Sequence, residues 1–284
     1  MGYNYIQMVE PENTGWSIML DTESRTRPAA VAGQFYTSDP QQLSAEIKYF
    51  LSQVHKPLNV IPKALIVPHA GHIYSGPVAA SAYKLLEPFA DKIKQVVLLG
   101  PSHRVAFKGI ATPDVDFFET PLGKIKVNTL SCNKAEQLRF VHANNTAHKD
   151  EHSLEVHLPF LQLLLNDFEL TPLVVGDCDR DDVARLLELF WDDDETLLVI
   201  STDLSHFHNY ATAVNKDRMT SAAIESLQPE QINYDDACGR APLNGLLTLA
   251  QHHQLKINCL DLRNSGDTAG DKDRVVGYGS YVVY

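Results

Sequence analysis

The chain has 284 residues, of which 44% are hydrophobic and 21% charged, and this composition excludes a disordered, collagen-like or low-complexity protein. Asp plus Glu total 36 against 24 for Lys plus Arg, and the resulting net charge of -12 repels a phosphate backbone and excludes nucleic acid as a partner. No apolar stretch approaches the roughly 20 residues that a membrane-spanning helix requires, so we expect no membrane association. The four cysteines lie far apart, which indicates free thiols and a cytoplasmic location.

Strand-like and helix-like patterns alternate along the chain. Residues 1–27 lack sustained periodicity and are expected to form a loosely held arm, and no linker interrupts residues 28–284. The pattern predicts a single α/β domain over 28–284, a sandwich whose central, mostly parallel or mixed sheet is flanked by helices. The expected strands are 64–67, 96–99, 117–127 as a hairpin, 169–175, 196–201, 256–262 and 275–283, and the expected helices are 40–54, 76–86, 134–140, 153–165, 181–190, 216–227 and 241–253.

Three histidines follow directly on predicted strands. They are His69, His103 and His206, which come after the first, second and fifth of these strands. Ligands and catalytic groups collect at the carboxyl edge of a parallel sheet, because the loops there leave a crevice between helix N-termini. A single loop histidine is more often only hydrogen-bonded, but the shared position of three of them predicts a common site.

Three acidic or thiol side chains are candidate partners for these histidines. Imidazoles combined with a carboxylate or a thiolate form sites for iron or zinc, and Asp203, Cys238 and Glu151 could supply the anion. Asp203 stands three residues before His206, a spacing that also suits a carboxylate that orients an imidazole. Cys238 precedes a predicted helix, whose positive end is expected to lower the pKa of the thiol.

Four residues are candidates for the wall of a substrate pocket. Glu151 and His152 lie in the run 150–157, which is dense in potential ligands but could equally be a helix start with acids at its positive end. His72 and Tyr74 follow His69 in the loop after the first strand, where they could wall a pocket or pack inside the fold. The sequence contains no G-x-S-x-G motif, which argues against a serine hydrolase.

Six segments, taken in order, resemble the MEMO family, whose bacterial and archaeal members are called protein B of the AmmeMemoRadiSam system. The resemblance covers nearly all of the chain from Pro28 onward. The segments that carry it are 29–36, 67–77 (VPHAGHIYSGP), 100–103 (GPSH), 151–159 (EHSLEVHLP), 201–206 (STDLSH) and 238–240 (CGR).

The resemblance implies a fold similar to the class III, LigB-type, extradiol dioxygenases, with a non-haem metal crevice. It implies that His69 and His103 are metal ligands and that Cys238 replaces the third, carboxylate ligand of the dioxygenases. His206 then acts as an acid or base beside the substrate, supported by Asp203. The implied metal is Fe(II), with Zn and Cu as alternatives. A thiolate in place of a carboxylate removes part of the ring-cleaving ligand set, so dioxygenase activity does not follow automatically.

Three functions are compatible with the sequence. The first is redox or dioxygenase-like chemistry on an unknown small substrate, the second is a catalytically inactive module that binds a peptide or a phosphorylated ligand, and the third is a zinc-dependent hydrolase. The resemblance also implies association with AMMECR1-like and radical SAM proteins.

Overall fold

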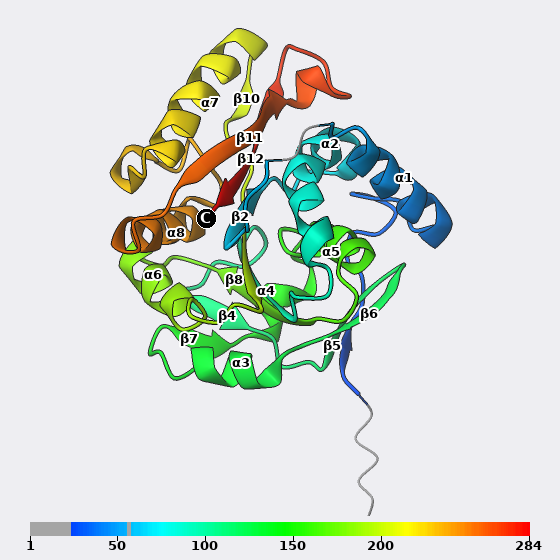
Figure 1. Cartoon of the computed structure of the whole chain (residues 1–284), viewed down its shortest axis with the longest axis vertical. Helices are drawn as coiled ribbons and strands as arrows, with labels where there is room; N and C mark the ends of the chain where they lie inside the picture. The colour runs from blue at the N-terminus through cyan, green and yellow to red at the C-terminus, as the bar shows by residue number, and fades with distance from the viewer. Residues whose placement is uncertain (1–23, 56–57) are drawn as a thin grey trace, which may run out of the picture.

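The computed structural model describes residues 24–55 and 58–284, and most of the expected arm, 1–27, therefore lies outside the described residues. Within the described part, nine strands form one mixed sheet with helices on both faces (Figure 1). This arrangement confirms the expected α/β sandwich. From edge to edge the strands are β10 (His206–His208), β12 (Val275–Val283), β2 (Ala64–Val67), β9 (Thr196–Ser201), β3 (Gln95–Pro101), β8 (Glu169–Val175), β4 (Ile110–Thr112) and β7 (Val141–Ala143), while β11 (Ile257–Asn264) also pairs with β12.

The centre of the sheet is parallel. β2, β9, β3 and β8 run in one direction, whereas β12 is antiparallel to β2 and β4 is antiparallel to β8. Alternate residues of the central strands enter opposite layers: Leu65 and Val67 pack into one hydrophobic core, and Ala64 and Ile66 pack into the other. Strands buried on both faces are apolar throughout, and this makes their short runs recognisable in the sequence.

Each core is closed by a layer of helices. α1 (Pro40–Ser52), α2 (His72–Tyr83) and α5 (Leu158–Leu164) bury apolar residues in the first core, and α6 (Arg180–Glu188), α7 (Tyr210–Glu225) and α8 (Arg240–His252) bury theirs in the second. The shorter elements are α3 (Thr129–Ala135), α4 (Asn145–Lys149) and the 3-10 turns η1 (Lys84–Phe89), η2 (Glu155–His157), η3 (Pro229–Gln231) and η4 (Ser265–Asp267).

The helix α2 starts about one turn earlier than the sequence suggests. The helix expected over 76–86 begins at His72: Gly71 is the N-cap, and its carbonyl accepts from the amides of Tyr74 and Ser75, at 2.8 and 3.1 Å. The hydroxyl of Ser75 donates to the carbonyl of Ala70, at 2.8 Å. His72 therefore belongs to a helix and not to a loop.

A small second sheet holds the beginning of the described chain. β1 (Thr26–Arg27) pairs with β5 (Phe117–Thr120), which forms the expected hairpin with β6 (Gly123–Lys126). Arg27 is only 5% exposed, and its Nη1 lies 2.6 Å from Oε2 of the buried Glu155. The packed part of the protein thus includes Thr26 and Arg27.

The topology brings the candidate residues to one edge of the sheet. β2, β3 and β9 are adjacent parallel strands, so their carboxyl ends lie together. His69, His103 and Asp203 each stand two residues beyond the end of one of these strands. Among the described residues, no helix is long and apolar enough to cross a membrane.

Candidate metal centre

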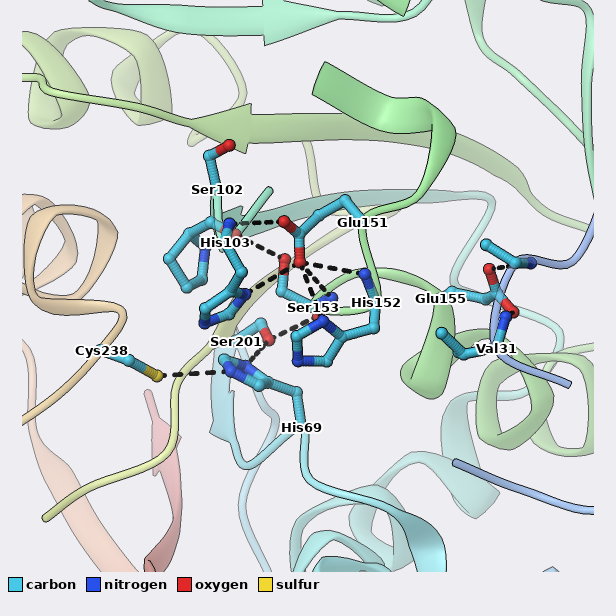
Figure 2. Close-up of polar contacts among 12 residues, drawn as sticks. Val31, His69, Ser102, His103, Glu151, His152, Ser153, Glu155, Ser201 and Cys238 are labelled. Atoms are coloured by element: carbon cyan, nitrogen blue, oxygen red, sulfur yellow. Dashed lines mark hydrogen bonds and ion pairs between the residues drawn. The ribbon is translucent and has the colours of Figure 1, made fainter. Parts of the chain in front are cut away.

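Three imidazoles converge at this edge of the sheet. His69, His103 and His152 each offer a ring nitrogen, and these three atoms lie within 4.8 Å of one another (Figure 2). The rings of His103 and His152 are stacked with centroids 4.5 Å apart, and the ring of His69 meets both edge-on at 5.1 and 5.5 Å. Such a set is a possible site for a metal ion.

Glu151 holds two of the three histidines in place. Its Oε1 lies 2.9 Å from Nδ1 of His103 and accepts from the amides of His152 and Ser153, at 3.0 and 2.9 Å, while Oε2 accepts from the amide of His103 at 2.5 Å. Burial alone would raise the pKa of Glu151, but these hydrogen bonds and the His103 ring lower it to about 2. The ionised carboxylate can only accept, so Nδ1 of His103 carries the proton and Nε2 is free to bind a metal.

A buried serine fixes the tautomer of His69. The hydroxyl of Ser201 donates its single proton to the carbonyl of Ser153, at 2.6 Å, and it therefore accepts from Nδ1 of His69 at 2.6 Å and from Nε2 of His157 at 2.9 Å. Nδ1 of His69 thus carries a proton and its Nε2 holds a lone pair. Each oriented histidine accordingly presents Nε2 as a potential ligand.

The three imidazoles suit a transition metal chemically. Burial lowers the pKa of His69 well below its ordinary value and lowers that of His152 to about 4, which keeps both rings neutral at pH 7. Neutral imidazole is the form that binds zinc, copper or iron. The buried Nδ1 of His152 makes no hydrogen bond to any described residue, although it lies 3.3 Å from Oε1 of Glu151. The donor set and this unpartnered nitrogen fit a metal ion.

Cys238 lies beside the three imidazoles but is not one of the converging group. Its Sγ is 3.3 Å from Nε2 of His69 and accepts from the amide of Asp203 at 3.3 Å. The expected lowering of the thiol pKa is wrong: burial raises the pKa of Cys238 to about 12, and this outweighs its position before α8. The role of Cys238 as a ligand stays a prediction, and the third member of the converging group is His152.

Asp203 supports His69 more directly than it supports His206. The buried Oδ1 of Asp203 accepts from the amide of His69 at 2.7 Å, and Oδ2 lies 4.0 Å from Nε2 of the same residue. Burial raises the pKa of Asp203 to about 6, against the nearby charge of His206. His206 opens β10 and is half-buried, and no hydrogen bond joins it to Asp203 in the described part of the chain. The predicted catalytic roles of both residues are untested by this geometry.

The four residues expected to line one substrate pocket lie in different places. Glu151 and His152 are parts of the centre itself, whereas the buried His72 lines a different cavity, and Tyr74 is 39% exposed. The sequence pattern did not indicate Ser153, Ser201 or His157, which help to fix the orientation of the centre, Ser153 through its backbone amide and carbonyl and the other two through their side chains. The one available signal was position, because Ser201 is the last residue of a buried strand and the other two lie in the ligand-dense run 150–157.

Comparison with known proteins supports the resemblance over the whole domain. The family model of the Memo-like proteins matches residues 27–282. A MEMO1 family protein of Aquifex aeolicus (strain VF5) is 35% identical over 265 residues, covering 89% of this chain and 97% of the relative. MEMO1 family proteins of Metallosphaera sedula and Ignicoccus hospitalis are 33% and 35% identical, with the same coverage of 89% and 97%. The chain therefore belongs to the Memo-like protein family.

Proposed function

We propose that the protein is a metal-dependent oxidoreductase that holds Fe(II) on His69, His103 and His152. The convergence of three imidazoles within 4.8 Å, from the buried His69, the half-buried His152 and the exposed His103, carries this proposal. Imidazole nitrogens suit iron, and fewer ligands than six leave positions for oxygen and substrate. When bound, Fe(II) supplies redox chemistry with oxygen that side chains cannot perform alone.

The residues around the imidazoles have separate tasks in this proposal. Glu151 accepts a hydrogen bond from Nδ1 of His103, and Ser201 accepts one from Nδ1 of His69. Both bonds hold the proton on Nδ1, which leaves the Nε2 atoms as the ligands for the metal. Asp203 positions the backbone of His69. The half-exposed His206 is the proposed group that accepts or donates a proton at the substrate, a task for which an imidazole is well suited near neutral pH.

A cavity beside Cys238 is the proposed substrate pocket. It has a volume of about 230 Å³, and its lining includes Ser102, Phe107, Tyr234 and Cys238. Ser102 immediately precedes His103, and Sγ of Cys238 lies 3.3 Å from Nε2 of His69, so the cavity approaches the centre from two sides. Its aromatic walls favour a small substrate with an apolar body.

Metal analysis after anaerobic purification tests the proposal. We expect iron in the unmodified protein and consumption of oxygen after it is loaded with Fe(II), and loss of both in His69→Ala, His103→Ala and His152→Ala. His142→Ala is the matched control, because His142 lies on β7 and is exposed. If the control and the three site variants retain the same iron, the proposed centre does not exist.

A zinc-dependent hydrolase is a second candidate, because three histidines without a directly bound carboxylate are also a ligand set of catalytic zinc. Zinc in the purified protein, together with hydrolysis and no oxygen consumption, would favour it. A protein that keeps no metal would favour the catalytically inactive binding module. Association with AMMECR1-like and radical SAM proteins and a cytoplasmic location stay predictions; all four cysteines are free thiols.

A further inference from the structure

A second cavity lies between the loop at 33–37, α1 and the first turn of α2. Its volume is about 380 Å³, and its lining includes Phe35, Gln42, Glu46, His72 and Ile73. None of the three converging imidazoles lines it. Phe35 adjoins both places, since its ring also packs against the ring of His152 with centroids 4.6 Å apart.

His72, one of the residues that line this cavity, carries an unused hydrogen-bond acceptor. The residue is 2% exposed, and its Nε2 lies 2.9 Å from the carbonyl of Val156, so Nε2 carries the proton and donates it. Nδ1 is then a lone-pair acceptor, and it has no hydrogen-bond partner among the described residues. Burial lowers the pKa of His72 to about 4, so Nδ1 stays unprotonated at neutral pH. A buried acceptor without a hydrogen-bond donor destabilises the protein, and a ligand that donates to Nδ1 would remove this cost.

Glu46 contributes a carboxylate to the cavity, and this carboxylate has no ion-pair partner among the described residues. It lies in the middle of α1, half-buried at the cavity, and burial raises its pKa. Within the described residues, no lysine, arginine or histidine lies within ion-pair distance of it, and neither lysine nor arginine lines the cavity. The cavity therefore offers negative charge and a neutral acceptor, with no side-chain cation to meet them.

Three backbone amides near the cavity, at the starts of α1 and α2, are already bonded. Asp39 accepts from the amides of Gln41 and Gln42 at the start of α1, both at 2.9 Å. The amide of His72 at the start of α2 donates to the carbonyl of Phe35 at 2.7 Å. These bonds occupy three of the donors near the two helix starts, and the carboxylate of Glu46 is the one charged group among the residues that line the cavity.

We propose that this cavity binds a primary ammonium group carried on a short apolar body, with Glu46 and Nδ1 of His72 as its acceptors. The aromatic ring of Phe35 and the side chain of Ile73, which is 60% exposed, form apolar walls for that body. An ammonium ion brings three donors, enough for both acceptors, and an aromatic wall also attracts a cation. The inference stands independently of the metal centre.

Calorimetric titration with three matched ligands tests this site. We expect benzylamine to bind to the unmodified protein, and benzyl alcohol and benzoate to bind at least about tenfold more weakly, because benzyl alcohol brings no positive charge to the carboxylate of Glu46 and benzoate is repelled by it. Glu46→Gln should lose about tenfold in benzylamine affinity. Glu119→Gln, a change at a half-buried glutamate on β5 far along the chain, should bind as the unmodified protein does. Equal binding of all three ligands, or no binding of benzylamine, overturns the proposal.

Two further variants locate the bound amine. His72→Phe keeps a ring between Tyr36 and Phe160 but removes Nδ1, and thermal unfolding shows whether it folds; if folded, it should bind benzylamine more weakly. His152→Ala should retain benzylamine binding, because a loss there would mean that the amine binds at the metal centre. Titration with a capped lysine, Nα-acetyl-lysine methylamide, distinguishes two sources of the ammonium group. If the capped lysine binds, the natural ligand is a lysine side chain of a peptide; if only benzylamine binds, it is a small free amine.

Discussion

Glu151 accepts two hydrogen bonds from His103: Oε2 accepts from the backbone amide at 2.5 Å, and Oε1 accepts from the ring Nδ1 at 2.9 Å. The same carboxylate accepts the amide of His152, so one buried charge sets the positions of two potential ligands. Bonds of this kind fix the tautomer of a ligand and raise its basicity. The metal affinity of the centre should therefore depend on a residue that does not touch the metal.

Glu151→Gln should weaken metal binding by about 10- to 100-fold, because the amide keeps the shape of the side chain but loses the charge that holds the Nδ1 proton of His103. Competition with a coloured chelator measures the affinity. Glu230→Gln, at an exposed glutamate of η3, is the control and should leave the affinity unchanged. Unaltered affinity in Glu151→Gln would show that Glu151 does not tune the centre.

Arg27→Ala should lower the free energy of unfolding by about 3–5 kcal/mol, because it leaves the charge of Glu155 buried without its partner. Glu155 also accepts from the amides of Ala30 and Val31 and from the hydroxyl of Tyr36, so the whole segment 27–36 depends on it. Urea unfolding measures the loss. Arg25→Ala breaks only exposed ion pairs, with Asp114 and Asp116, and should change stability little. Equal losses in the two variants would contradict the anchoring role of Arg27.

The unfolding free energy should fall as the pH drops from 7 toward 4. Burial lowers the pKa of His148 to about 3, below the unfolded value of about 6.5. A depressed folded pKa means that the unfolded chain binds the proton first, so the stabilisation is complete above pH 6.5 and is lost as the pH falls toward 3. The slope is at most about 1.4 kcal/mol per pH unit for one such histidine.

His148→Gln should reduce this pH dependence by the share of one histidine, since other buried histidines, such as His69 and His72, keep theirs. The new amide can still donate to the carbonyl of Ala111, which Nε2 of His148 meets at 2.9 Å. Urea unfolding at a series of pH values is the measurement. His142→Gln, at an exposed histidine, should keep the slope of the unmodified protein. An equal reduction in both variants would show that the burial of His148 does not contribute to the pH dependence.

Cys238→Ser should cost less metal affinity than His152→Ala, because Cys238 lies outside the converging group and is held as a thiol by burial. Its Sγ nevertheless faces Nε2 of His69 at 3.3 Å, so a moderate effect on the environment of the metal is expected. Cobalt(II) substitution gives the readout, since a thiolate ligand adds a sulfur charge-transfer band. Loss of such a band in Cys238→Ser would assign the thiolate as a ligand.

The sequence was informative about the sheet because its central strands are apolar on both faces and short. The ends of β2 and β3 could be located from their apolar runs, and with them the positions of His69 and His103. His152 could not be assigned, because its segment reads equally as the start of a helix, and the carboxylate that positions it is its own neighbour Glu151. Nor could the protonation of Cys238 be inferred, since desolvation depends on tertiary packing that no local pattern records.

X-ray absorption spectroscopy at the edge of the bound metal counts the imidazoles and sulfurs that coordinate it. We expect a shell of nitrogen and oxygen ligands with three imidazoles in the unmodified protein, reduced to two imidazoles or to no bound metal in His152→Ala. A sulfur ligand in the unmodified protein, with an unchanged imidazole count in His152→Ala, would contradict a centre built on His69, His103 and His152.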